Sequence, residues 1–273
     1  MTEIEEQLRY RVEDGVAWIT LNRPQAGNAL TPDQRNRLIA LFESASGDVA
    51  IRVIVLGAEG RHFCTGADLR ADRADGPAGP EGARERPTGS VARMIAMGAQ
   101  RLVAAVLDCE KPVIAAVGGT AAGIGAHLAL ASDLVIASED ARFIEVFVRR
   151  GIIPDGGGAY LLPRLVGLHL AKELVFFGDD LSAADAARIG LVNKVVPGAE
   201  LEATAREWAT RLATGPTRTI GFAKRLLNRS LDVDRATMFE EEALIVEHVT
   251  STADCAEGMS SFVERRPPEF RGW

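Results

Sequence analysis

Short apolar runs separated by turn residues dominate the first half of the chain, and each run has the length of a β-strand rather than of a helix. Glu13, Asp14 and Gly15, which separate the first two runs, are typical of a hairpin turn. The later runs are almost purely apolar, so we expect buried strands. The predicted strands cover residues 8–12, 16–21, 51–56, 113–117, 134–137 and 143–148.

Helical spacing takes over in the second half. The first predicted helix begins with Thr31 as N-cap and Pro32 at the first helical position, and Gln34 is placed to reach back to the cap. This pattern favours an α/β protein with a core in residues 1–200 and a helical C-terminal region in residues 201–273. Further helices are predicted for residues 90–108 and 253–264, and from about residues 123, 167, 182, 201, 217 and 234.

The composition is that of a globular protein, because 47% of the 273 residues are hydrophobic and 25% are charged. The net charge is −7 and no basic block stands out, which argues against nucleic acid as a partner. The N-terminal residues lack the apolar stretch of a signal peptide, and no apolar stretch of membrane-spanning length is free of charge. We therefore expect a cytoplasmic protein with no membrane partner and, given three unpaired cysteines, free thiols.

A glycine-rich turn at residues 118–125 follows the strand at 113–117 and leads into a helix. Glycine lets a ligand approach the backbone, and the N-terminus of a helix has free N–H groups that favour an anion. A dinucleotide fingerprint needs a third glycine near His127, and a P-loop needs G-K-[ST]; both are absent, as is G-x-S-x-G. The residues leave two interpretations: tight packing of a helix on a strand, or a hole for an oxyanion.

An oxyanion hole needs two N–H groups that point at one oxygen atom in a dry site. One donor can come from the start of the glycine helix, and Gly66, Ala67 and Asp68 form the best second turn. The four histidines have no carboxylate or cysteine at metal-ligand spacing, so no metal site is predicted. Residues 71–89 are rich in glycine, proline and charge and predict a mobile loop.

Six segments resemble the crotonase (enoyl-CoA hydratase/isomerase) superfamily, in that family's order, and the resemblance extends from about Leu8 to the C-terminus. It implies a spiral of β-β-α repeats with a helical trimerisation region, assembled as a homotrimer or a dimer of trimers. It also implies acyl-CoA thioester substrates, with coenzyme A as part of the substrate and no separate cofactor. The segments are NRPQAGNAL, GRHFCTGADL, KPVIAAVGGTAAGIGAHLALASDLVIAS, GIIPDGGGAYLLPRLVG, LSAADAARIGLVNKVV and EGMSSFVERRPPEF.

The resemblance also implies where the substrate lies. The backbone N–H groups of Ala67 and Ile124 match the oxyanion donors of the family. Basic residues near the C-terminus often contact the CoA phosphates there, and Lys224, Arg265 and Arg266 are the candidates here. The loop at residues 71–89 is expected to border the acyl pocket. The residues implied to bind substrate are Arg23, Ala26, Ala29, Gly66, Asp68, Leu69, Gly123 and Phe147.

The chain departs from the family's hydratases at two positions. Those enzymes carry glutamates where this sequence has His127 and Phe147, and hydration suits two carboxylates because one group activates water while the other delivers a proton. Glu145 lies two residues before Phe147, on the same face if the segment is extended, and can take over part of the role. His127 either orients water or substrate or is a core histidine.

Asp155, in the segment IIPDGGG, is the predicted base. Some isomerases of the family that act on unsaturated acyl-CoA, including the ring-epoxide isomerase of phenylacetate breakdown, use an aspartate that matches this position. We expect burial beside Ile152, Ile153 and Phe147 to raise the pKa of Asp155. The alternative is that Asp155 only caps the helix that begins near Ala159.

The sequence therefore predicts an enoyl-CoA isomerase, because a double-bond shift needs a single base whereas hydration suits two carboxylates. The residues assigned to catalysis are Asp155, Ala67, Ile124 and His127. Two alternatives remain open at this point: an enoyl-CoA hydratase of fatty-acid degradation, and a non-catalytic family member that binds acyl-CoA.

Overall fold

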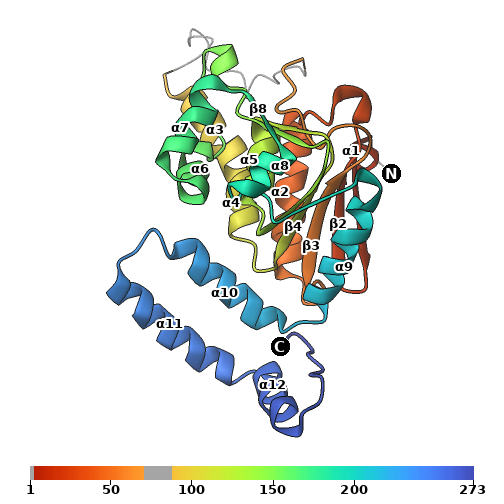
Figure 1. Ribbon diagram of the computed structural model, residues 1–273, viewed down its shortest axis with the longest axis vertical. Helices are drawn as coiled ribbons and strands as arrows, with labels where there is room; N and C mark the ends of the chain where they lie inside the picture. The colour runs from red at the N-terminus through yellow and green to blue at the C-terminus, as the bar shows by residue number, and fades with distance from the viewer. Residues whose placement is uncertain (1–2, 71–87) are drawn as a thin grey trace, which may run out of the picture.

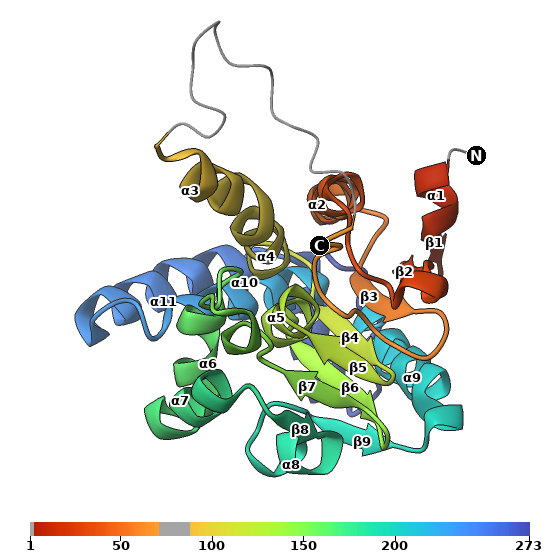
Figure 2. The same ribbon diagram turned by 90° about the horizontal axis from the view of Figure 1, so that it is seen from above.

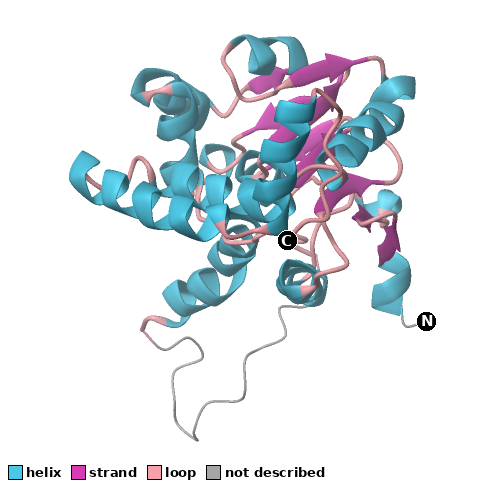
Figure 3. Ribbon diagram, turned by 90° about the horizontal axis from the view of Figure 1, so that it is seen from below, coloured by secondary structure: helices cyan, strands magenta, loops and turns pink. Residues whose placement is uncertain are grey.

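The computed structural model describes residues 3–70 and 88–273, so most of the loop predicted for residues 71–89 lies outside the described residues. Within these ranges the strands form two sheets (Figure 1). Figure 3 shows the strands gathered in the middle of the molecule with helices on both sides. This layered arrangement buries the apolar faces of both kinds of element.

The larger sheet is parallel except for its first hairpin. The predicted hairpin turn narrows to Asp14 and Gly15, which both take left-handed backbone conformations (φ 51° and 76°), while Glu13 pairs with Val16 in the ladder. The strands occur in the order β1 (Leu8–Glu13), β2 (Val16–Leu21), β3 (Val53–Ala58), β4 (Val113–Val117), β6 (Leu134–Ser138) and β9 (Lys194–Val196).

The smaller sheet was only partly predicted. It consists of β5 (Thr120–Ala122), β7 (Arg142–Ile144) and β8 (Asp180–Ser182). The predicted strand at residues 143–148 is wrong beyond Ile144, because the chain turns there and Phe147 has helical backbone angles (φ −59°, ψ −47°). The strands β5, β8 and β9 were missed because three residues are too few to show a periodic pattern.

Helices cover the larger sheet on both faces (Figure 2). The first long helix begins with the predicted capping box, in which Thr31 Oγ1 accepts from Gln34 N while Gln34 Oε1 accepts from Thr31 N. The helices are α1 (Glu3–Gln7), α2 (Pro32–Gly47), α3 (Ser90–Ile95), α4 (Arg101–Leu107), α5 (Ile124–Ala131), α6 (Gly158–Val166), α7 (Leu168–Phe177), α8 (Ala183–Arg188), α9 (Leu201–Ala213), α10 (Thr217–Arg229), α11 (Arg235–Thr250) and α12 (Ala253–Glu264).

Alternation along β2 explains the two layers of the core. Ile19 points into the main cluster with Phe42 and Leu128 from α2 and α5, whereas Trp18 faces the opposite cluster with Ala205 and Ala209 from α9. The two clusters share no strand side chain because successive side chains alternate between the faces of a sheet. The helical region predicted from residue 201 thus begins with a helix that packs on the sheet, and the proposed division at residue 200 stays a prediction.

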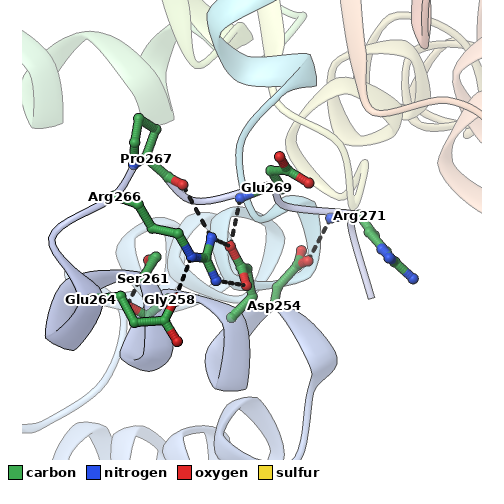
Figure 4. A network of polar contacts seen from close by, with 9 residues as sticks. Asp254, Gly258, Ser261, Glu264, Arg266, Pro267, Glu269 and Arg271 are labelled. Carbon is green, nitrogen blue, oxygen red and sulfur yellow. Dashed lines mark hydrogen bonds and ion pairs between the residues drawn. The ribbon is translucent and has the colours of Figure 1, made fainter.

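The helices α10, α11 and α12 extend from this core as a separate layer (Figure 1). The C-terminal tail is tied to α12: Arg266 pairs with Glu264 at 2.6 Å and donates to the carbonyl oxygen of Pro267, and Asp254 accepts from the backbone of Arg271 (Figure 4). Arg52, which precedes β3, donates to the carbonyl oxygen of Phe270 in that tail. The tail therefore connects the helical layer back to the core.

Among the residues that the structure describes, one helical run is long and apolar enough, by length and composition alone, to cross a membrane: Ser90–Leu107, which comprises α3, a π-helical segment (Ala96–Gln100) and α4. A helix that packs on a protein core passes the same test. Leu102, Val103 and Val106 of this run are buried in the main hydrophobic cluster.

Candidate active site

Two turns that are far apart in the sequence lie side by side. Cys64 pairs with Ala121 in an isolated parallel bridge, and Ala122 N donates to Cys64 O at 2.8 Å. A Cβ built on Gly123 would lie 4.0 Å from the Cα of Gly66. The residues that follow the two glycines, Ala67 and Ile124, are therefore brought together as the sequence predicted.

The start of α5 can approach this bridge only because it carries glycine. Gly123 has φ 55° and ψ −124°, a conformation open to glycine alone. A Cβ on Gly125 would lie 2.2 Å from the carbonyl oxygen of Cys64, well inside van der Waals contact. Cys64 itself is fully buried, and burial raises the pKa of its thiol to about 12, so it fills space rather than reacting.

The backbone N–H groups of Ala67 and Ile124 have no acceptor among the backbone and side-chain groups that the structure describes. Ile124 is the first residue of α5, so its N–H is one of the donors that a helix start leaves unpaired. Ile124 is 7% exposed, whereas Ala67 lies at the surface of the turn. Such a pair can supply two donors to one oxygen atom of a ligand.

The segment at residues 23–29 is locked against the Gly66 turn. Leu30 N donates to Gly66 O and Asp68 N donates back to Leu30 O, both at 2.9 Å. Arg23 forms an ion pair with Asp68 at 2.6 Å and donates to the carbonyl oxygen of Ala29 at 3.1 Å. The structure thus brings together the predicted residues Arg23, Ala26, Ala29, Gly66 and Asp68, whereas Leu69, which follows Asp68, is exposed.

Asn28 organises this segment and was missed by the sequence analysis. It is 2% exposed with φ 54°; its amide donates to the carbonyl oxygens of Glu59 and His62, and its Oδ1 accepts from Arg23 N. The signal that could have found it is an asparagine directly after glycine in a broken segment, because asparagine tolerates left-handed backbone and bonds to nearby main chain.

Asp155 lies in the turn before α6, beside the start of α5. A Cβ on the next residue, Gly156, would lie 2.6 Å from Ile124 Cδ1, so the turn is in contact with the start of α5. The N-cap of α6 is Gly157 and no side chain caps this helix, so the alternative role of Asp155 as a cap is wrong. Desolvation by burial raises the pKa of Asp155, while the nearby charge of His127 lowers it.

The expected cause of this burial was partly wrong. Ile152 is 52% exposed and Ile153 is 79% exposed, so neither encloses the carboxyl group. Phe147 is buried, and its ring stacks on His127 with a centroid distance of 5.1 Å and an interplanar angle of 15°. Asp155 is therefore flanked by the first turn of α5 rather than by its own neighbours in the chain.

His127 is fully buried and forms a contact with Glu145 that joins Nε2 to Oε2 at 3.1 Å. Glu145 is 5% exposed. Glu145 and Phe147 were expected to share one face of an extended strand, but the chain turns after Ile144. Both side chains nevertheless contact His127. His127 is therefore neither isolated nor satisfied: Nε2 has a partner, and Nδ1 has none among the described residues.

Two of the basic candidates for phosphate binding are engaged elsewhere. Lys224 is 7% exposed, and its three donors are used by Asp133 at 2.8 Å and by the carbonyl oxygens of Val106 and Lys111. Arg266 forms ion pairs with two glutamates of α12. Arg265 is the exposed candidate and stays a prediction. Over residues 3–70 and 88–273, no cluster of three His, Cys, Asp or Glu side chains fits a metal ion.

The fold and this geometry define a class of protein: an α/β protein in which two adjacent backbone turns can hold an oxygen atom beside a carboxylate. Residues 11–272 match the family model described as enoyl-CoA hydratase/isomerase. The chain is 38% identical over 265 residues to a probable enoyl-CoA hydratase of Rhodobacter capsulatus, with 97% of this chain and 98% of that protein covered.

Two further similarities agree with this family. The chain is 37% identical to the 1,2-epoxyphenylacetyl-CoA isomerase of Escherichia coli over 96% of this chain and 97% of that protein. A solved structure of an enoyl-CoA hydratase/isomerase from Cupriavidus metallidurans is 36% identical, with a TM-score of 0.87 and 98% and 97% of the two chains covered. The chain belongs to the crotonase (enoyl-CoA hydratase/isomerase) superfamily and has its α/β fold. It is an acyl-CoA enzyme of that family.

Proposed function

We propose that this enzyme shifts a double bond in an unsaturated acyl-CoA thioester. Asp155 takes a proton from the carbon next to the double bond, which forms a dienolate, and returns it at another carbon of the same system. The backbone N–H groups of Ala67 and Ile124 hold the thioester oxygen as negative charge develops on it. No water is added, so substrate and product have the same composition.

The position of Asp155 is the observation that supports this proposal. Its carboxyl group is half-buried, it caps no helix, and its turn contacts the residue that supplies one of the two proposed oxyanion donors. A carboxylate with a raised pKa is better suited to take up a proton and to release it again near neutral pH. The position that hydratases of the family fill with a second glutamate is occupied here by Phe147, which stacks on His127.

The proposed binding site for coenzyme A is the locked segment formed by Arg23, Ala26, Ala29 and the Gly66 turn. Its hydrogen bonds hold the backbone in place before substrate arrives, which reduces the entropy lost on binding. The thioester would then lie against the adjoining Gly66 and Gly123 turns, with the acyl chain directed towards Asp155. Further residues proposed to contact substrate are Asp68, Leu69, Gly123 and Phe147.

The test is the interconversion of 3-enoyl-CoA and 2-enoyl-CoA, followed through the absorbance of the conjugated thioester. Asp155→Asn should lower the rate by about 100- to 10,000-fold, the usual contribution of a general base, while calorimetry shows acyl-CoA affinity unchanged. Glu207→Gln, an exposed carboxylate on α9, is the matched control and should keep full activity. Wild-type turnover in Asp155→Asn would refute the proposal.

A second candidate, hydration of 2-enoyl-CoA, is favoured by the Glu145–His127 contact. This pair supplies a second acid–base group beside Asp155, and hydration needs two. The same assay separates the reactions, because hydration removes the conjugated absorbance and yields a 3-hydroxyacyl-CoA whose mass has increased by one water molecule. A product of unchanged mass supports isomerisation.

We also propose assembly as a homotrimer or a dimer of trimers through the helical layer. Large apolar side chains are exposed there, and such patches mark interaction surfaces. Sedimentation velocity would detect the assembly, and a monomer at micromolar concentration would contradict it. The residues are Phe239, Leu244 and Val246 of α11 and Met259, Phe262 and Val263 of α12. A cytoplasmic location stays a prediction.

A further inference from the structure

The buried Glu145–His127 pair raises the question of where its protons lie. The side chain of His127 is fully buried and that of Glu145 is 5% exposed. Among the described residues, His127 Nε2 is the one hydrogen-bond partner of the Glu145 carboxyl group. If Glu145 were ionised and His127 neutral, the pair would carry a net negative charge without a compensating cation. Because an uncompensated charge is costly to bury, we consider the arrangements in which the pair is neutral.

Two arrangements of the pair are neutral. In the first, Glu145 is ionised and His127 is protonated on both ring nitrogens. In the second, protonated Glu145 donates to Nε2, and the neutral imidazole then carries its hydrogen on Nδ1. Both arrangements put a hydrogen on Nδ1. The buried nitrogen without a described partner is therefore a donor that lacks an acceptor.

The turn that carries Asp155 faces this donor. A Cβ on Gly156 would lie 2.9 Å from His127 Nδ1, and a Cβ on Gly158 would lie 2.4 Å from Nε2. The two glycines thus let the backbone after Asp155 rest directly on the imidazole ring. Phe147 stacks on the same ring and fixes its plane. The charge of His127 lowers the pKa of Asp155, against the effect of burial.

We infer that His127 is a positioning residue for Asp155: held by Glu145 at Nε2, it donates its Nδ1 hydrogen to the ionised Asp155 carboxylate in the working enzyme. This inference rests on the proposed function of Asp155 as base. The hydrogen bond orients the carboxylate towards the substrate held by the Ala67 and Ile124 N–H groups. Among the described residues, Glu145 is the other ionisable group that contacts the ring, and it acts on Asp155 through the imidazole.

The state of the proton can be measured without turnover. In protein with ¹⁵N-labelled histidine, saturated with a non-reactive acyl-CoA, the His127 resonances are assigned by their loss in His127→Asn. We expect a hydrogen on Nδ1 and a shift of that signal in Asp155→Ala, while the exposed His169 on α7 does not respond. If Nδ1 carries no hydrogen, or if its resonance is the same in Asp155→Ala as in the wild type, the inference is overturned whatever the activity of the enzyme.

A matched pair of variants tests the consequence for catalysis. In His127→Asn the side-chain amide lies near the position of Nδ1, whereas in His127→Gln it lies near the position of Nε2. Each change is combined with Glu145→Gln, so that no unpaired carboxylate is buried. Without the Nδ1 donor the carboxylate of Asp155 is less stabilised, so its pKa rises.

The His127→Gln variant should therefore show an acid limb of kcat/KM about 1 pH unit above that of His127→Asn. KM at high pH should be similar in the two variants. Coincident acid limbs would mean that His127 only fills space and would refute the positioning role. If the wild type does not isomerise enoyl-CoA, or if Asp155→Asn still does, the proposed function of Asp155 is refuted instead. Failure of the positioning role and failure of the proposed function are therefore distinguishable.

Discussion

Lys224 offers a stringent test of what holds the helical layer to the core. It lies on α10, and its ammonium group donates to Asp133, which follows α5, and to the carbonyl oxygens of Val106 and Lys111. The side chain of Lys224 is 6% exposed and that of Asp133 is 21% exposed. Lys224→Met keeps the apolar stem of the side chain and removes only the charge and its donors.

The expected cost follows from the carboxylate that is left behind. Removing one partner of a buried ion pair typically costs about 3–5 kcal/mol, because the other charge remains buried without compensation. In the double variant Lys224→Met with Asp133→Asn, no charge is stranded, and the side-chain amide oxygen of the introduced asparagine can still accept from Val113 N, as the Asp133 carboxylate does at 2.7 Å. The double variant should therefore be more stable than Lys224→Met, even though it carries one change more.

The pH dependence has a defined sign. Desolvation already raises the pKa of Asp133, whereas Lys224 lowers it, so this pKa rises further in Lys224→Met. For a carboxyl group whose folded-state pKa is raised, the penalty is fully present above that pKa, shrinks as the pH falls below it and disappears below the unfolded-state pKa. The deficit of Lys224→Met should thus be largest at alkaline pH and shrink towards acid pH, whereas position 133 no longer titrates in the double variant.

Urea denaturation at one protein concentration, followed by circular dichroism, measures these differences across pH. A double-mutant cycle with Asp133→Asn gives the coupling energy of the pair. A coupling below about 0.5 kcal/mol, with the same pH profile for both variants, would refute the argument that a stranded carboxylate sets the cost.

Three further outcomes are expected. Gly125→Ala should unfold the site or abolish turnover, because the added Cβ would lie 2.2 Å from Cys64 O. The control Gly57→Ala should be tolerated, because a Cβ there meets no atom within 4 Å, and equal activities of the two variants would contradict this. Thr31→Ala should lower the free energy of unfolding by about 1 kcal/mol through loss of the capping box, and an unchanged urea midpoint would disprove it. The isomerisation rate should fall as the pH drops through the raised pKa of Asp155, because the base must be ionised; a pH–rate profile with no acid limb above about pH 4 would contradict the assignment.

Long local patterns were sufficient to predict most of the elements. The strand β2, the cap of α2 and the whole of α12 appear where the sequence places them, because each depends on neighbours a few residues apart. The strands β5 and β8 were missed because each has only three residues and is defined by its pairing with β7, which is distant in the chain. The end of β7 was misplaced for the same reason: apolar side chains continue to Val148, but the backbone turns after Ile144.

The same distinction applies to the candidate site. The glycines of the two turns were recognisable, since a turn that must admit a close neighbour has a local signature. Which acidic side chain meets His127 was not, because the contact with Glu145 joins residues 18 positions apart. Lys224 was a reasonable candidate for a phosphate until its burial was known; its 91-residue separation from Asp133 leaves no pattern in the chain.

The sequence by itself determined the family, most of the longer elements, the two glycine turns and the candidate aspartate, because these features depend on short-range spacing and residue type. The tertiary structure alone decided that Asp155 caps no helix, that Ile152 and Ile153 do not bury it, and that His127 lies between Glu145 and the Asp155 turn. Burial and proton position depend on every segment that packs around a group, and such packing is a property of the folded chain rather than of any one stretch of it.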